Sequence, residues 1–200
     1  MIVLKRKVLA VLGLLVCVIG IGSYFIFSHY NTVEEYQVDS LSIQHQFLTL
    51  NEYSRAGDSL PYVRGIVIHY TANPLSTAQN NRDYFESLKD KHETKASSHF
   101  IIGLNGEVIQ CIPLNEVAYA SNSRNYDTIS IECCHSDETG KFNTQTYQSL
   151  QTLVKALMKT YHLNTDDVIR HYDVTGKICP KYFVEHEDAW NEFLSSLDDN

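Results

Sequence analysis

Residues 97–112 read SSHFIIGLNGEVIQCI, and this stretch decides the fold class. Two runs rich in β-branched and aromatic residues flank Asn105-Gly106, a dipeptide that is the strongest short-range signal for a β-hairpin. A hairpin joins antiparallel strands, whereas parallel strands need a long crossover connection. The sheet that contains this hairpin is therefore not wholly parallel.

Strand and helix patterns alternate on both sides of the hairpin. Short β-rich runs alternate with segments whose apolar residues follow helical spacing, in the order 66–70, 76–88, 128–134, 143–161, 168–171 and 185–197. This alternation is typical of helices packed on a sheet, and the hairpin adds an antiparallel pair to it. The sequence therefore predicts an α/β protein with a mixed central β-sheet flanked by helices in a single domain.

An apolar segment near the N-terminus predicts a membrane anchor. Residues 8–27 carry no charge, and about 20 helical residues are long enough to span the hydrocarbon core of a bilayer. The basic tripeptide 5–7 precedes this segment, and positive charges stay on the cytoplasmic side. We therefore expect a cytoplasmic tail over residues 1–7, one transmembrane helix over 8–27, and a single-pass protein of the cell membrane with an extracytoplasmic domain. A cleaved signal peptide is the alternative, although SYFIFSHY (residues 23–30) lacks an A-x-A-like cleavage site.

The rest of the chain divides into a linker and one domain. Residues 28–46 are mostly polar and acidic with no sustained apolar period, so we expect a stalk with little fixed structure. Residues 47–200 have the size of one ordinary globular domain, which we expect to be a monomer.

Charge and cysteine usage limit the possible partners. The formal net charge of −8 argues against nucleic acid as a partner, because such binding is driven by Lys and Arg that neutralise phosphates. Cys133 and Cys134 alternate across a predicted strand, so their thiols do not face each other. We expect buried free thiols at Cys111 and Cys133, and a bridge from Cys111 is the alternative in an oxidising exterior.

Two histidines and a cysteine form a candidate metal set. His69 stands at the end of the predicted strand GIVIHY. Considered without the other two residues, His69 would be interpreted as a histidine of the core rather than as a metal ligand. His171 and Cys179 are separated by YDVTGKI, a glycine-containing segment that can fold back and bring both side chains to one point. Two imidazoles and one thiolate suit Zn²⁺ with a fourth position open to water, which is the arrangement of catalytic zinc sites.

These motifs together resemble the type 2 N-acetylmuramoyl-L-alanine amidases, which include the phage zinc lysozymes and are related to peptidoglycan-recognition proteins. The similarity covers residues 47–197 and rests on four motifs in the same order, namely GIVIHY, SSHFIIGLNGEVIQ, DTISIE and RHYDVTGKICP. The resemblance implies that His69, His171 and Cys179 bind Zn²⁺. It further implies that Glu132 is the general base and that Lys177 lies beside the scissile carbonyl.

The resemblance implies an activity, and the sequence departs from the family pattern in two places. Members hydrolyse the amide between N-acetylmuramic acid and L-alanine of peptidoglycan with a zinc-activated water. Ser98 stands where some phage relatives carry a catalytic Tyr, and His99 beside it is interpreted as structural or as a support for a ligand. Residues 118–122 (AYASN) lack the Trp-His-Ala-Gly of many members, so the substrate contacts of this loop stay open.

Two other functions remain as alternatives. A cysteine peptidase would use Cys179 as nucleophile, His171 as base and Asp173 to orient the base. A peptidoglycan-binding module that has lost catalysis would need none of the metal set. The presence of Cys179, Glu132 and Lys177 therefore favours an enzyme over such a module.

Overall fold

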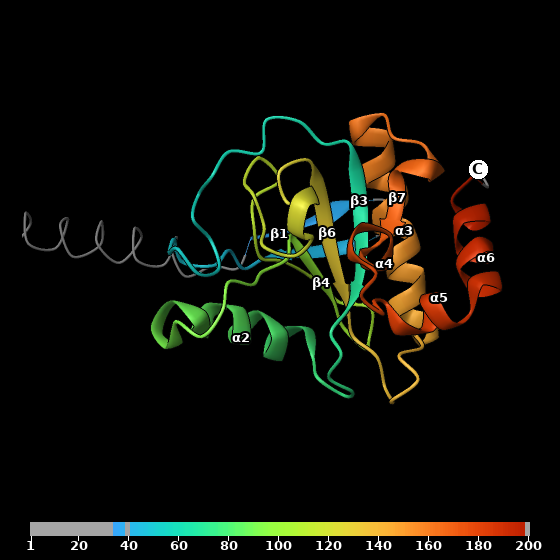
Figure 1. The fold of residues 1–200 in the computed structure, drawn as a ribbon, viewed down its shortest axis with the longest axis horizontal. Helices are drawn as coiled ribbons and strands as arrows, with labels where there is room; N and C mark the ends of the chain where they lie inside the picture. The colour runs from blue at the N-terminus through green and yellow to red at the C-terminus, as the bar shows by residue number, and fades with distance from the viewer. Residues whose placement is uncertain (1–33, 39–40, 199–200) are drawn as a thin grey trace, which may run out of the picture. The chain divides into compact units, whose positions relative to one another are not determined.

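A seven-stranded mixed β-sheet forms the centre of the computed structural model, which describes residues 34–38 and 41–198 (Figure 1). In spatial order the strands are β1 (Glu34–Val38), β2 (Leu41–His45), β5 (Val108–Gln110), β4 (Phe100–Ile102), β6 (Thr128–Cys133), β3 (Gly65–Tyr70) and β7 (Val168–Arg170). Strands β4 and β5 pair antiparallel, whereas the pairs β2–β5, β4–β6, β3–β6 and β3–β7 are parallel. The predicted mixed sheet is confirmed.

The hairpin β4–β5 forms where the sequence predicted it. Phe100 lies opposite Gln110 and Ile102 opposite Val108 in the antiparallel register. Gly106 in the turn has a φ of 81°, a left-handed conformation that glycine adopts without strain. Ser149 donates its hydroxyl to the carbonyl of Gly106 at 2.7 Å, which ties the turn to the long helix packed beside it.

Five α-helices surround the sheet in the described part of the chain: α2 (Ala78–Lys91), α3 (Thr144–Tyr161), α4 (His171–Thr175), α5 (Lys181–Glu185) and α6 (Glu187–Asp198). Thr77 caps α2 by accepting a hydrogen bond from the backbone N–H of Asn80, and Asn143 caps α3 in the same way through Thr146. The three predicted helices correspond to α2, α3 and α6 with small shifts at their ends. Helices α4 and α5 were not predicted.

The helices cover the two faces of the sheet unequally. Helices α3, α5 and α6 pack on one face, and α2 packs on the other (Figure 1). Cys133 lies in the core on the α3 side and Cys134 in the core on the α2 side, as the strand alternation predicted. Cys111, Cys133, Cys134 and Cys179 are all buried free thiols.

The expected stalk over residues 28–46 is wrong for the strands that this range contains. Strand β2 pairs in parallel with β5, which places Ile43 opposite Val108, and Ile43 is 1% exposed. The segment LSIQH has a single buried position among partly buried neighbours. Its apolar and polar residues alternate too weakly for the sequence alone to indicate a strand near the edge of the sheet. The folded domain therefore begins before residue 47.

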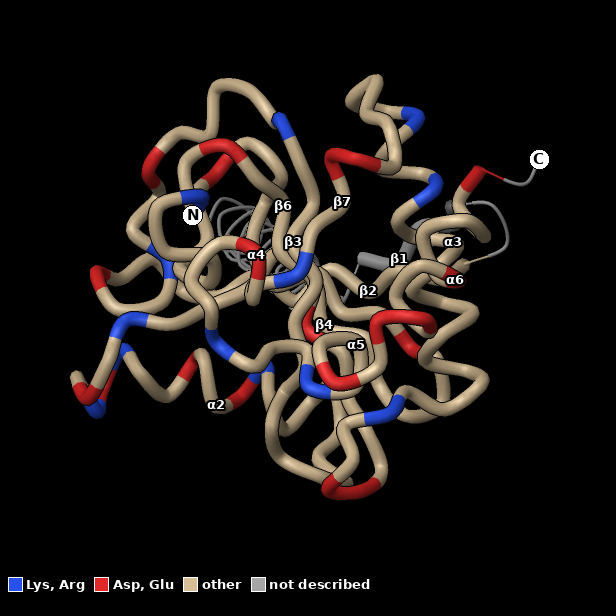
Figure 2. The backbone as a smooth tube through the Cα atoms, turned by 45° about the vertical axis from the view of Figure 1, so that its right-hand side comes forward, with Lys and Arg blue, Asp and Glu red and all other residues tan. Residues whose placement is uncertain are grey.

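The expected tail at residues 1–7 and the expected membrane helix at 8–27 lie outside the described residues. Within residues 34–38 and 41–198, no helix has both the length and the apolar character needed to cross a bilayer. Lys and Arg alternate with Asp and Glu over several loops and helices of this region (Figure 2).

Candidate active site

The candidate ligands lie where neighbouring parallel strands end. His69 is the last residue but one of strand β3, and its register partner on β6 is Glu132. His171 is the first residue of α4 and follows β7 directly, while Cys179 lies just before α5. Because β7, β3 and β6 are adjacent and parallel, their carboxyl ends meet at one edge of the sheet, the usual place for a site in an open α/β sheet.

The structure brings His69, His171 and Cys179 together as the sequence predicted. The ligand atoms of these three residues lie within 4.8 Å of one another, and all three side chains are buried. The Sγ of Cys179 is 3.8 Å from the Nδ1 of His69, and the two imidazole rings are 4.7 Å apart between centroids. Two nitrogens and one sulfur at this separation match the donor set of a catalytic zinc site.

Each histidine of this cluster uses its Nε2 for a protein contact. His69 Nε2 lies 3.2 Å from the hydroxyl of Ser121, and His171 Nε2 lies 2.9 Å from the amide oxygen of Asn122. The Nδ1 of His171 is buried and has no hydrogen-bond partner among the described residues. A buried nitrogen without a partner is costly unless a ligand completes it, so the cluster fits a metal ion.

Burial keeps the histidines neutral, as metal ligands must be. Burial, followed by the charges of His171 and Lys177, holds the pKa of His69 well below its usual value. Burial and Lys177 also lower the pKa of His171. Burial and the neighbouring Glu132 raise the pKa of Cys179 to about 12, so the thiol keeps its proton until a bound cation stabilises the thiolate.

Glu132 is a buried carboxyl group beside this cluster. Burial raises its pKa to about 8, although the charge of Lys177 acts in the opposite direction. Its Oε2 atom is buried and has no hydrogen-bond partner among the described residues. A carboxyl group with these properties can exchange a proton near neutral pH, as a general base or acid requires.

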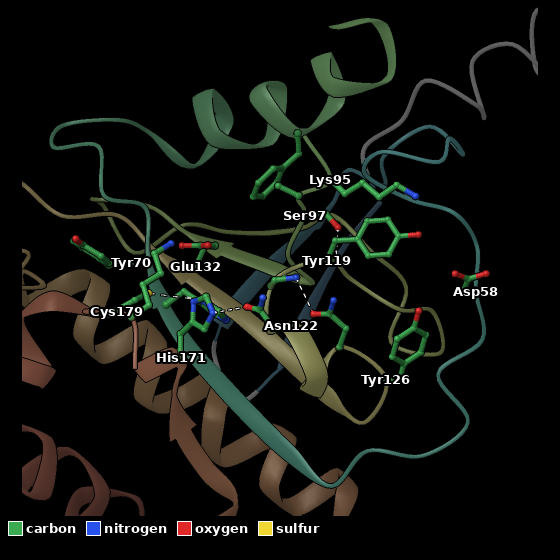
Figure 3. A pocket seen from close by; sticks show the side chains of 16 residues that line it. Asp58, Tyr70, Lys95, Ser97, Tyr119, Asn122, Tyr126, Glu132, His171 and Cys179 are labelled. Atoms are coloured by element: carbon green, nitrogen blue, oxygen red, sulfur yellow. Dashed lines mark hydrogen bonds between the residues drawn. The ribbon is translucent and has the colours of Figure 1, made fainter. Parts of the chain in front are cut away.

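All five predicted site residues line one cavity of about 610 Å³. His69, His171, Cys179, Glu132 and Lys177 share it with residues of other loops, namely Asp58, Tyr70, Phe85, Lys95, Ala96, Ser97, Tyr119, Ala120, Asn122, Asn125 and Tyr126. Cys179, His171 and Glu132 lie at one end of the cavity, and Asp58, Tyr119 and Tyr126 lie at the other (Figure 3). The cavity therefore extends from the reactive cluster along a polar and aromatic wall, which suits an extended substrate.

His99 and Ser98 do not line this cavity. His99 is buried, with its Nδ1 3.0 Å from the hydroxyl of Ser130 and its Nε2 3.0 Å from the carbonyl of Glu116. Ser98 donates its hydroxyl to the carbonyl of Ser130 at 2.9 Å. Both residues join strands β4 and β6, which agrees with the structural interpretation of His99.

Sequence reasoning missed the contacts of Ser121 and Asn122 with the two histidines. These contacts connect positions 52 and 49 residues apart in the chain. The sequence of this loop, AYASN at residues 118–122, departs from the family pattern. This departure indicated that the loop differs from that of the relatives, but it did not indicate that Ser121 and Asn122 contact the histidines.

A cavity that combines two neutral imidazoles, a thiol and a buried carboxyl group at the end of a sheet is typical of metal-dependent hydrolases with a single metal ion. The chain belongs to the N-acetylmuramoyl-L-alanine amidase family, whose model matches residues 59–182.

Known proteins agree with this assignment. The chain is 36% identical over 171 residues to the N-acetylmuramoyl-L-alanine amidase CwlL of Bacillus licheniformis, in an alignment that covers 79% of this chain and 47% of that protein. The structure of the catalytic domain of XlyA superposes with a TM-score of 0.65 and 26% identity, covering 78% of this chain and 98% of that domain. Drosophila peptidoglycan recognition protein SD shares the fold, with a TM-score of 0.55 and 18% identity over 65% of this chain and 83% of that one. This chain spans about half the length of the curated amidases it matches first.

Proposed function

We propose that this protein hydrolyses the amide bond between the lactyl group of N-acetylmuramic acid and L-alanine in peptidoglycan. The observation that carries the proposal is the convergence of His69, His171 and Cys179 beside Glu132 in one cavity of an amidase-family chain. Relatives that match most of this chain are named as N-acetylmuramoyl-L-alanine amidases, which supports the choice of bond.

The two histidines and Cys179 would hold a zinc ion. The donor set supports this choice, because imidazole nitrogens together with a thiolate are typical zinc ligands. When bound, zinc supplies a Lewis acid that polarises the scissile carbonyl and makes a nearby water more acidic. The chain offers three ligand atoms within 4.8 Å, and a site with three protein ligands keeps a position for solvent or substrate.

Glu132 and Lys177 would complete the reaction. Glu132 accepts a proton from the attacking water through its unpartnered Oε2 and then delivers that proton to the leaving amine of L-alanine. Lys177 lines the same cavity, and its charge stabilises the negative charge that develops on the carbonyl oxygen.

The contacts of Asp173 argue against the cysteine peptidase alternative. The carboxylate of Asp173 accepts hydrogen bonds from the backbone N–H and the guanidinium of Arg170, with the closest ion-pair distance at 2.9 Å. A peptidase triad needs this carboxylate on the imidazole of His171, which instead contacts Asn122. The Sγ of Cys179 lies 3.8 Å from the Nδ1 of His69, a histidine to which the peptidase alternative assigns no role.

The products of wall digestion test the proposed reaction. Purified peptidoglycan incubated with the full chain should release stem peptides with a free N-terminal L-alanine and leave glycan strands with intact lactyl groups. Mass spectrometry of the soluble fragments identifies the bond. Cleavage within the stem peptide would support the peptidase instead. Co-sedimentation of the protein with peptidoglycan, with no peptide released, would support a binding module.

We also propose that residues 8–27 anchor the enzyme in the cell membrane with the amidase domain outside the cytoplasm. The support is the uncharged segment of about 20 residues after the basic tripeptide 5–7. The chain should then stay with membranes after an alkaline carbonate wash, and external protease should digest the domain once the wall is removed. Release of the full-length chain by the wash would contradict the anchor.

A further inference from the structure

Ser121 and Asn122 are adjacent residues that contact both histidines of the proposed zinc site. The hydroxyl of Ser121 lies 3.2 Å from Nε2 of His69, and the amide oxygen of Asn122 lies 2.9 Å from Nε2 of His171. Ser121 is 1% exposed, and Asn122 lines the active-site cavity, where it points toward His171 (Figure 3). Two adjacent residues of one short loop therefore contact the Nε2 atoms of both imidazoles.

The chemistry of these contacts determines which nitrogen of His171 carries the proton. An amide oxygen only accepts hydrogen bonds, so Nε2 of His171 donates to Asn122 and its Nδ1 keeps a free lone pair. That Nδ1 is the buried atom without a partner among the described residues. The Nδ1 of His69 faces the Sγ of Cys179 at 3.8 Å, so both histidines present the same nitrogen to the site.

The loop is held in a conformation that aims Asn122 at His171. Asn122 has a φ of 52°, in the left-handed region that residues other than glycine rarely occupy and that Asn tolerates best. The side-chain oxygen of Asn125 accepts hydrogen bonds from the backbone N–H groups of Ala120 and Ser121. Thr128 donates its hydroxyl to the carbonyl of Arg124 at 2.6 Å and closes the turn. A rare backbone conformation that its surroundings fix in this way is characteristic of a functional position.

We infer that Ser121 and Asn122 are positioning residues that set the ring orientation of His69 and His171, and that Asn122 also sets the tautomer of His171, so that each ring presents Nδ1 to the site. This inference rests on the proposed zinc site and deepens it. Hydrogen-bond partners of this kind fix the ligand before the metal arrives and make the imidazole more basic. Their loss typically lowers metal affinity by about 10- to 100-fold.

Substitutions at Asn122 separate positioning from simple packing. In Asn122→Gly the acceptor is lost, but glycine accepts the left-handed φ, so the loop backbone should remain in place. In Asn122→Asp the acceptor is kept and becomes charged. Ser123→Gly is the matched control, because Ser123 is exposed in the same turn.

Two measurements on each protein test the inference. Nitrogen-15 NMR of histidine side chains, recorded on the zinc-free full chain in detergent, reports the tautomer of His171. Competition with a chelator gives the dissociation constant for zinc.

The inference predicts a distinct result for each protein. The parent, Asn122→Asp and Ser123→Gly should show His171 protonated at Nε2 alone, whereas Asn122→Gly should show a mixture of tautomers and bind zinc about 10- to 100-fold more weakly. A single Nε2–H tautomer and parental zinc affinity in Asn122→Gly would overturn the inference. If that variant did not fold, a tenfold or greater loss of zinc affinity in Asn122→Asp would overturn it instead. Failure of the parent itself to bind zinc would refute the proposed metal site, which is a separate outcome.

Discussion

Replacement of Glu132 by glutamine is expected to slow amide hydrolysis by about 10²- to 10⁴-fold, the usual contribution of a general base. Glutamine has nearly the same shape but cannot accept the proton of the attacking water. Zinc binding should persist, because Glu132 is outside the group formed by His69, His171 and Cys179. The measurement is the initial rate of amino-group release from peptidoglycan, with zinc content determined on the same samples.

Stability distinguishes a catalytic Glu132 from a structural one. Burial raises the pKa of Glu132 to about 8, so the fold disfavours its ionised form. A group whose pKa rises on folding costs stability as the pH increases from its unfolded pKa toward its folded pKa. In zinc-free protein the melting temperature of Glu132→Gln should therefore equal or exceed that of the parent near neutral pH. Glu93→Gln, at an exposed carboxylate, is the control for loss of charge. A variant with parental activity would remove Glu132 from the mechanism.

Replacement of Cys179 is expected to abolish activity when the new residue is alanine and to leave part of it when the new residue is aspartate. Alanine removes the ligand atom. The zinc affinity should therefore fall by more than the roughly 10- to 100-fold that is typical when a ligand loses only its hydrogen-bond partner. Aspartate keeps an anionic ligand, and carboxylate oxygen is also a zinc ligand. Each variant is assayed for amino-group release from peptidoglycan at a fixed, saturating concentration of zinc.

The aspartate variant also separates the amidase from the cysteine peptidase. Aspartate cannot replace a thiol nucleophile, so the peptidase alternative predicts that both variants are equally inactive. Cys111→Ala provides the matched control, because Cys111 is another fully buried free thiol and lies outside the cavity lining. Equal inactivity of Cys179→Ala and Cys179→Asp, with zinc still bound to both, would favour the nucleophile.

Much of the fold follows from local patterns. The Asn105-Gly106 turn predicted the antiparallel pair, and the apolar spacing and capping residues predicted α2 and α3 within a few residues. Strand β2 was missed because its pairing with β5 joins residues far apart in the chain, and one buried Ile43 gives little alternation to detect. Pairing across such separations depends on tertiary contacts, which local propensity does not encode.

The candidate site could be predicted where its residues follow local patterns, and not where their contacts depend on the tertiary structure. His171 and Cys179 are near in sequence, and His69 ends a clear strand, so residue type and spacing were enough to select them. The structure adds that α4 begins at His171, so the segment expected as a loop starts with a helical turn. The roles of Ser121 and Asn122 could not be predicted, because their orientation depends on the left-handed turn and on Asn125.

The central claim is that His69, His171 and Cys179 together bind the zinc that the amidase needs. Its most direct test is the zinc content per chain, measured by mass spectrometry after dialysis, in the parent and in Cys179→Ala. We predict one zinc per parent chain, and little zinc with no hydrolysis in Cys179→Ala. A Cys179→Ala protein that retains zinc at the parental level and hydrolyses peptidoglycan at the parental rate would contradict the claim.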